Sequence, residues 1–376
     1  MKVLFIAYQY LFGNGGGEFA ARAFINAFAE IADEMTLLYP MCNGGEATGI
    51  NKSIRCIPVW DERPKIRRII DFLIGRQNRF RNIEKLVGDD DYDVVVYSGG
   101  LLVEGTIDFF KRRGIKTITI HHNYDYEYFR DNTKFPMRIP QLFWISRIEG
   151  EAVRKSDLNI TLTPSDKELL KKHYARGNEQ FEVLGAFEYV RKEHPIYTDV
   201  EEPKFLITGS LGAMQTENSL LPWMDEYYHI LKEVFPSATL TLAGKNPSEI
   251  LLEKASRLGI EVIPNPESMQ PVLAKAKYYL CATALGGGLK LRVMDGLSAG
   301  LPVICHEVSA RGYEAFIQQG MLLVYNDTAS FRRQLEILKK KSYDKKTTIE
   351  LYEQLFSFEH GKLRLFNILQ KQNLLK

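Results

Sequence analysis

Short apolar runs alternate along this chain with longer segments in which apolar residues recur every three or four positions. The first pattern predicts buried β-strands and the second predicts amphipathic helices, so the chain consists of repeated strand and helix units. Such units form parallel sheets with right-handed crossovers. In the first half we expect strands at residues 2–8, 35–39, 54–59, 93–97, 116–121 and 158–162. In the second half we expect them near 204–209, 238–243, 260–263, 278–281, 302–305 and 321–324.

The alternation breaks once, at residues 188–203, which are polar, charged and without periodicity. This segment predicts a linker between two domains, and 376 residues exceed the size at which one core usually stops growing. We therefore expect an α/β fold of two doubly wound, Rossmann-like domains facing a cleft, at 1–187 and 204–354. Residues 355–376 return to a helical pattern, and we expect them to cross back onto the first domain.

Composition and charge exclude several classes of protein. Charged residues make up 26% and hydrophobic residues 45% of the chain, as in globular proteins, and the net charge of +2 does not suggest a nucleic-acid partner. No apolar segment approaches the roughly 20 residues of a membrane span. The cysteines, Cys42, Cys56, Cys281 and Cys305, have neither a C-x-x-C pair nor histidines at metal-ligand spacing. We expect a reducing, cytoplasmic environment, no structural zinc and no cofactor.

Residues 284–300 combine three consecutive glycines, 286–288, with two cations and a carboxylate directly after an apolar run. Glycines let the backbone approach a ligand closely, and a helix starting beside them would present N–H groups to phosphate. Lys290 and Arg292 add full charges, and Asp295 could accept hydrogen bonds from a ribose. These residue types suggest a nucleotide diphosphate with its sugar attached. The alternative is a strand, a glycine turn and a helix with solvated cations.

A second glycine-rich segment, Gly15, Gly16 and Gly17, follows the first expected strand and opens the first expected helix, residues 18–31. Ligands bind at this place in doubly wound sheets. The dinucleotide fingerprint G-x-G-x-x-G fails, because its third glycine would fall on Glu18. A nicotinamide or flavin dehydrogenase is therefore disfavoured, and a loop that touches a phosphate or a sugar is favoured.

Paired histidines, His121 and His122, end the strand expected at 116–121. There a histidine can hydrogen-bond a sugar hydroxyl or transfer a proton near neutral pH. We favour His122 as the functional residue, because Asn123 and Glu127 supply further polar groups nearby. The alternative places one histidine in the core and the other in solvent.

Two further segments have competing interpretations. Residues 89–93 contain four aspartates that resemble a metal-binding Asp-x-Asp, but they precede the strand at 93–97 and should form a solvated turn at the wrong edge of the sheet. Residues 63–86 combine eight Lys or Arg with apolar residues at helical spacing. This segment is expected either to contact an anionic membrane peripherally or to be a crossover helix whose apolar face packs on the sheet.

Together, the loop at 284–300, the early glycines 15–17 and the His122 turn resemble the group 1 (retaining) family of GT-B fold glycosyltransferases. The resemblance spans nearly the whole chain. Segments 161–168, 205–210, 240–244 and 300–305 also resemble strand and helix steps of that family.

The resemblance implies a metal-independent, hexosyltransferase-like enzyme that moves a sugar from a nucleotide-diphosphate donor to a glycan or lipid-linked acceptor in polysaccharide biosynthesis. The amides of Gly287, Gly288 and Leu289 would contact the diphosphate together with Lys290, and Asp295 would take the place of the glutamate that binds the ribose. His122 would lie beside the transferred sugar. The backbone near 264–267 would meet the base.

The sequence departs from that family at two places. The first of two carboxylates usually separated by seven residues is missing, because Gly287 stands eight positions before Asp295. Residues 208–214 also lack the cations often found after the first strand of the second domain, for which Lys290 and Arg292 would compensate. The alternative function is an inert sugar-nucleotide-binding or scaffolding partner in a glycosyltransferase complex.

Overall fold

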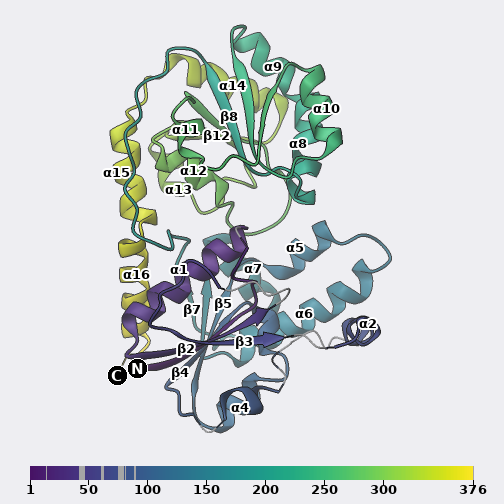
Figure 1. The fold of residues 1–376 in the computed structure, drawn as a ribbon, viewed down its shortest axis with the longest axis vertical. Coiled ribbons are helices and arrows are strands. Elements are labelled where there is room, and N and C mark those ends of the chain that lie inside the picture. The colour runs from purple at the N-terminus through teal and green to yellow at the C-terminus, as the bar shows by residue number, and fades with distance from the viewer. Residues whose placement is uncertain are drawn as a thin grey trace. The chain divides into compact units, whose positions relative to one another are not determined.

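The computed structural model describes residues 1–13, 15–41, 47–60, 63–74, 80, 82–88 and 90–375. They form two compact units (Figure 1). Unit 1 comprises Met1–Lys192 and Phe356–Lys376, and unit 2 comprises Glu193–Leu355. From the sequence we expected the first domain to end at residue 187, the second to begin at residue 204, and the segment that crosses back to begin at residue 355. Each unit is built on one sheet whose paired strands all run parallel.

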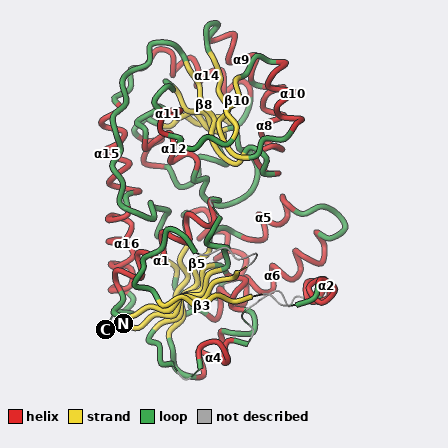
Figure 2. The backbone as a smooth tube through the Cα atoms, viewed as in Figure 1, coloured by secondary structure: helices red, strands yellow, loops and turns green. Residues whose placement is uncertain are grey.

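The sheet of unit 1 has seven strands in the order β3-β2-β1-β4-β5-β6-β7. Figure 2 shows its strands in yellow, with β3 and β5 labelled. Its strands are β1 Lys2–Ala7, β2 Glu34–Met41, β3 Arg55–Trp60, β4 Val94–Ser98, β5 Lys116–His121, β6 Leu158–Thr161 and β7 Phe181–Val183. Its helices are α1 Gly16–Ile31, α2 Lys65–Leu73, α3 Ile83–Val87, the 3₁₀ helix Gly100–Val103, α4 Ile107–Arg112, α5 Asp125–Asn132, α6 Arg138–Lys155, α7 Pro164–Tyr174 and α16 Phe358–Lys371. The central strands are apolar on both faces because helices cover both, as parallel sheets require.

The terminal helix α16 packs in unit 1, although more than 150 residues separate it from the rest of that unit. Lys362 forms an ion pair with Glu30 of α1 at 2.7 Å, and Arg364 donates to the carbonyl oxygen of Leu184 at 3.0 Å. Gly361 lies against the ring of Phe187, where a Cβ would collide with the ring. These contacts attach the C-terminal helix to the first unit.

The sheet of unit 2 has six strands in the order β10-β9-β8-β11-β12-β13. Its strands are β8 Lys204–Ser210, β9 Thr239–Lys245, β10 Glu261–Pro264, β11 Tyr278–Cys281, β12 Val303–His306 and β13 Leu322–Tyr325. Its helices are α8 Met214–Glu226, α9 Tyr228–Val234, α10 Glu249–Arg257, α11 Gln270–Leu273, α12 Arg292–Ser298, α13 Glu314–Gln318, α14 Thr328–Lys340 and α15 Lys345–Phe356.

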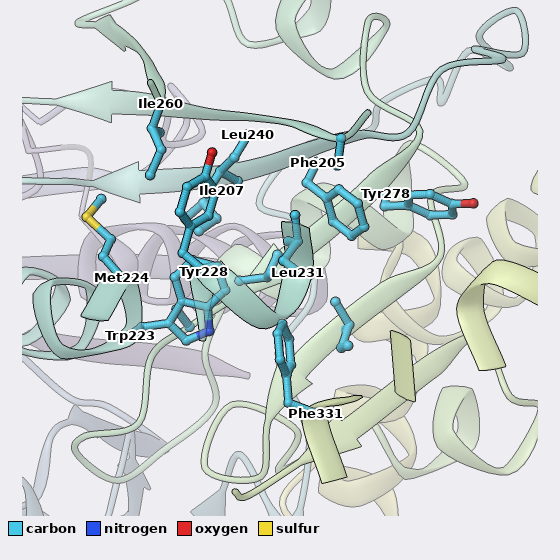
Figure 3. Packing of buried hydrophobic residues seen from close by; sticks show 14 of the residues in the cluster. Phe205, Ile207, Trp223, Met224, Tyr228, Leu231, Leu240, Ile260, Tyr278 and Phe331 are labelled. Atoms are coloured by element: carbon cyan, nitrogen blue, oxygen red, sulfur yellow. The ribbon is translucent and has the colours of Figure 1, made fainter. Parts of the chain in front are cut away.

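Aromatic and aliphatic side chains from α8, α9, α14 and the sheet form one core cluster in unit 2 (Figure 3). Trp223 of α8 meets the ring of Phe331 of α14 edge-on, with ring centroids 5.9 Å apart. Phe205 and Ile207 of β8 contribute from the sheet side. This packing anchors β8, whose carboxyl end carries Thr208 and Gly209 of the candidate site.

The two parallel sheets expected from the alternating pattern are confirmed, and each expected strand lies within two residues of an observed one. The sequence missed β7, because three residues are too few to show a period. Segment 63–86 was open between two interpretations, and the crossover-helix interpretation is wrong for the part at 65–74. The side chains of Ile66, Ile69, Ile70, Leu73 and Ile74 face solvent, and residues 75–79 and 81 lie outside the described residues.

Candidate functional site

The strand order of unit 2 reverses between β8 and β11, which are neighbours in the sheet. From β8 the chain proceeds to β9 and β10 on one side, and from β11 to β12 and β13 on the other. Open parallel sheets bind ligands outside the strand carboxyl ends at such a reversal. The segment 284–300 follows β11, so the topology places it where a ligand is expected.

Glycines shape the loop after β11. Gly286 and Gly288 have φ values of +78° and +72°, which side chains rarely adopt. The side-chain amide of Gln215, from α8, donates to the carbonyl oxygen of Leu285 at 2.6 Å, and a Cβ on Gly286 would collide with that amide. This conformation therefore requires glycine at 286. The partner Gln215 lies 70 residues away and gave no signal in the sequence.

Lys290 is only 8% exposed and folds back over its own loop. Its Nζ donates to the carbonyl oxygens of Gly287 at 2.9 Å and Gly286 at 3.2 Å. The hydroxyl of Tyr313 donates to the carbonyl oxygen of Lys290 at 2.9 Å and fixes the backbone there. Leu289, between these residues, is half-buried. The expected phosphate-binding cation is thus held at the glycine turn by carbonyl dipoles.

Helix α12 begins at Arg292 and has seven residues. The helix therefore starts after the glycine turn. From the sequence we had expected it to start beside the glycines. The helix dipole acts mainly within the first turn. The backbone and cations of the loop, and not a long helix, are the groups that could hold an anion here.

Arg292 supplies a cation at the end of β8. Its guanidinium lies against Gly209, which has a φ of +135°, and a Cβ on Gly209 would lie 3.2 Å from the Cζ atom of Arg292. Its Nη2 donates to the hydroxyl of Thr216 at 3.0 Å. Residues 208–214 contain no cation of their own, so α12 provides one from 83 positions along the chain.

Asp295 belongs to a buried hydrogen-bond chain that crosses from α12 to the sheet. The hydroxyl of Thr208 on β8 donates to Asp295 Oδ2 at 2.6 Å and lies 2.5 Å from the hydroxyl of Tyr279 on β11. Burial and the Asp295 charge raise the pKa of Tyr279 well above its usual value, so this phenol stays protonated. The chain fixes the carboxylate at the strand reversal.

Residues 264–267 follow β10 at the same edge of the sheet. Asn265 has a φ of +49°, and its backbone N–H donates to the carbonyl oxygen of Gly244 at 2.8 Å. Its side-chain oxygen accepts from the backbone N–H of Asn246 at 3.0 Å. Both asparagines adopt left-handed backbone, which this residue type tolerates, so the turn is held by local hydrogen bonds.

In unit 1, the glycines after β1 form the start of α1. Gly15 is its N-cap residue, and Gly16 and Gly17 are its first two residues. The carboxylate of Glu18 lies against this turn, since a Cβ on Gly15 would be 2.5 Å from Glu18 Oε2. An anionic group there repels phosphate. The turn is better suited to uncharged hydroxyl groups.

The buried Arg22 of α1 holds the same glycine turn from behind. Its Nη2 donates to the carbonyl oxygens of Leu11 at 2.7 Å and Gly13 at 2.5 Å, and its Nε donates to that of Thr48 at 2.6 Å. Nothing in the sequence indicated this role for Arg22.

His122 follows β5 beside the strand reversal of unit 1, which lies between β1 and β4. Its Nε2 lies 2.9 Å from the hydroxyl of Ser98 at the end of β4, and that hydroxyl is 3.4 Å from the side-chain oxygen of Gln9 after β1. Its Nδ1 is buried and has no hydrogen-bond partner within the described part of the chain. One ring nitrogen is thus oriented by the protein, whereas the other has no partner among the described residues.

Burial, with a smaller contribution from the neighbouring His121, lowers the pKa of His122 to about 4. The ring is therefore neutral at pH 7 and suits a hydrogen bond better than proton transfer. His121 is buried and contacts Asn159 Oδ1 through Nε2 at 2.9 Å. One histidine lies in the core, as the alternative interpretation had it, but the other is held by Ser98 and does not lie in solvent.

A cluster of buried carboxyl groups behind His122 was missed in the sequence. Asn123 donates to Asp125 Oδ1 at 3.0 Å, and the backbone N–H of Asp125 donates to Glu149 Oε1 at 2.6 Å. Burial raises the pKa of both Asp125 and Glu149, and their proximity to other acids adds to the rise. Glu127 instead pairs with Arg130 on the surface. The cluster braces the turn that carries His122.

The aspartates before β4 lie at its amino end, away from the strand carboxyl ends. Asp90 pairs with Arg55 at 2.9 Å, Asp91 pairs with Arg113 at 3.4 Å, and Asp93 accepts from the backbone N–H of Lys2 at 2.8 Å. Asp89 lies outside the described residues. This is the turn expected from the order of the elements.

Within the described ranges, no group of three or more His, Cys, Asp or Glu side chains is placed to hold a metal ion. Among the same residues, no helix is both long and apolar enough to cross a membrane.

Residues 202–340 match the family model described as glycosyl transferases group 1. A comparison with curated protein sequences gives no significant match. Among solved structures, the chain is similar to a sucrose-phosphate synthase from Thermosynechococcus elongatus, with a TM-score of 0.73, 12% identity and full coverage of both chains. It is also similar to HepE from Anabaena in complex with UDP, with a TM-score of 0.69, 12% identity and coverage of 99% and 100%. A third is the lipopolysaccharide outer core galactosyltransferase WaaB, with a TM-score of 0.67, 15% identity and coverage of 99% and 100%.

Proposed function

Since the chain carries a group 1 glycosyltransferase domain on a GT-B fold, we propose that it transfers a sugar from a nucleotide-diphosphate donor to a glycan or lipid-linked acceptor. Unit 2 would hold the donor and unit 1 the acceptor. HepE was solved in complex with UDP, and WaaB is a lipopolysaccharide outer core galactosyltransferase, which supports this class of substrates. A role in polysaccharide assembly and a cytoplasmic location remain predictions.

The observation that carries the proposal is the pairing of Lys290 and Arg292 with a glycine turn at the strand reversal of unit 2. Lys290 is bonded to the carbonyl oxygens of that turn, and Arg292 lies on Gly209 at the end of the neighbouring strand. Glycine backbone and two cations together match the size and charge of a diphosphate. Burying the ammonium group of Lys290 costs free energy, so its position at the edge of the sheet where ligands bind favours a functional role.

Chemically, these groups would stabilise the departing nucleotide diphosphate. Cations and backbone N–H groups that are already in place need no reorganisation as negative charge develops on the leaving oxygen. Asp295, held by Thr208, would accept from the ribose, and the 264–267 turn would contact the base. The proposed mechanism requires no metal ion.

His122 would bind a hydroxyl group of the transferred sugar. A neutral ring whose Nε2 donates to Ser98 presents Nδ1 as an acceptor, and that is the nitrogen without a partner. Gly15, Gly16 and Gly17 would contact other uncharged hydroxyl groups, since the Glu18 carboxylate disfavours phosphate there. We propose that the anomeric configuration is retained, as in the family that the chain resembles.

The test is a donor panel of UDP-, GDP-, TDP- and ADP-sugars with the purified protein. We expect one nucleoside diphosphate to bind by calorimetry and its sugar nucleotide to be slowly hydrolysed. Asp295→Ala should weaken binding, and His122→Ala should slow turnover without changing affinity for the free diphosphate. Lys340→Met, at an exposed position of unit 2, is the control. Failure of all nucleoside diphosphates to bind would exclude the proposed function.

The missing carboxylate at Gly287 supports one alternative, an inert sugar-nucleotide-binding partner in a glycosyltransferase complex. Such a protein binds the diphosphate but never turns over its sugar nucleotide. Donor hydrolysis or transfer by the isolated chain therefore excludes it.

A further inference from the structure

Helix α2 turns its apolar face toward solvent. Ile66, Ile69, Ile70 and Leu73 recur at i, i+3, i+4 and i+7, so they share one face of the helix. Ile66 is 73% exposed, and the other three are at least two-fifths exposed. A crossover helix of a globular protein normally buries this face against the sheet.

The buried side of α2 carries a carboxylate, Asp71, whereas the cations of the helix are exposed. Asp71 is 5% exposed and forms ion pairs with Arg63 Nη1 at 2.9 Å and Arg67 Nε at 3.1 Å. Both arginines lie in the same segment as Asp71, so these ion pairs neutralise the carboxylate that the helix buries, while its isoleucines stay exposed.

The beginning of α6 and the turn before it add a second group of exposed apolar side chains. Ile139 and Phe143, one turn apart, are 65% and 63% exposed. Trp144 joins the two helices, because its Nε1 donates to the carbonyl oxygen of Leu73 at 2.8 Å. Figure 1 shows α2 beside the start of α6. We call this the α2–α6 surface, formed by Ile66, Ile69, Ile70, Leu73, Ile74, Phe135, Met137, Ile139 and Phe143.

Cations dominate the segments that carry this surface. Residues 63–74 and 133–147 contain seven Lys or Arg and a single acidic residue, Asp71, which is buried, whereas the whole chain has a net charge of only +2. Lys65 and Arg68 are exposed on α2 itself. Apolar side chains surrounded by cations match the chemistry of an anionic lipid bilayer.

We propose that the α2–α6 surface binds an anionic membrane, with its isoleucines and Phe143 inserted at the level of the lipid headgroups. A second copy of this chain is a poorer occupant, because a symmetric contact would bring the cations of one copy against those of the other. The proposal does not depend on the donor site, which lies in the other unit.

The test is sedimentation of the full chain with vesicles of mixed phosphatidylglycerol and phosphatidylcholine, compared with pure phosphatidylcholine. We expect binding to the anionic vesicles that weakens as salt is added. Lys65→Gln with Arg68→Gln should weaken it about 25-fold, at about fivefold per cation. Ile66→Asp with Ile70→Asp should weaken it by about tenfold or more, because both side chains leave the lipid.

Ile250→Asp is the matched control, since Ile250 is an equally exposed isoleucine, 61%, on α10 of unit 2. It should bind vesicles as the unaltered chain does. All variants should keep their affinity for the nucleoside diphosphate, which separates this proposal from the donor site. Equal binding to neutral vesicles, no binding, or α2 variants that bind unchanged would each overturn it. So would a dimer, seen by analytical ultracentrifugation, that the α2 variants dissociate.

Discussion

Replacing Lys290 with methionine separates two roles that the structure allows for this side chain. Methionine fills a similar volume without charge, so no large cavity forms. The carbonyl oxygens of Gly286 and Gly287 lose a donor, at about 1–3 kcal/mol each. Relief from burying an ammonium offsets that loss by several kcal/mol. We therefore expect the unfolding temperature to change by less than about 5 °C.

The effect on the diphosphate should be much larger. A hydrogen bond to a charged partner contributes about 1.5–3 kcal/mol, so Lys290→Met should weaken UDP binding by roughly ten- to 150-fold. Uridine lacks the diphosphate, and its affinity should change by less than about twofold, because no charged contact is lost. The assay is calorimetry with both ligands, or with the matching pair for whichever base binds.

The comparison with uridine decides between the roles. If Lys290 only shapes the glycine turn, UDP and uridine will lose affinity equally. If neither loses affinity, the phosphates bind elsewhere. Either result refutes the assignment of Lys290 to the diphosphate, and Lys340→Met should leave both affinities unchanged.

Three further predictions concern unit 1. Ser98→Ala should raise KM for the sugar nucleotide about tenfold but leave UDP affinity unchanged, because the ring of His122 loses one hydrogen-bond partner; a parallel loss of UDP affinity would contradict this. By nitrogen NMR, His122 should stay neutral from pH 7 to pH 5, since burial lowers its pKa to about 4, and a ring that titrates near 6.5 would be incompatible. Because the unfolded chain binds that proton below about pH 6.5 and the folded chain does not, this histidine should reduce stability as the pH falls toward 4. Arg22→Leu should lower the free energy of unfolding in urea by about 3 kcal/mol, as carbonyl oxygens of Leu11, Gly13 and Thr48 each lose a charged donor; a loss below about 1 kcal/mol would argue against this role.

The sequence by itself determined the two parallel sheets and the positions of most strands. Buried strands of a parallel sheet must be apolar over their whole length, and such runs are visible without any long-range information. The order of strands and turns also placed Asp90 and Asp91 at the amino end of β4. Segment 284–300 was singled out because its glycines and cations are adjacent in the chain.

Only the tertiary structure decided which side chains meet. Arg292 lies on Gly209, Gln215 holds the turn at Leu285, and Ser98 orients His122, and each pair is separated by at least 24 residues. The orientation of α2 shows the same limit. Helical periodicity reveals that a helix has an apolar face, but the direction of that face depends on contacts with other elements, such as the hydrogen bond from Trp144 of α6 to Leu73. Local patterns report burial and period, whereas pairing across the fold is set by packing that no short segment contains.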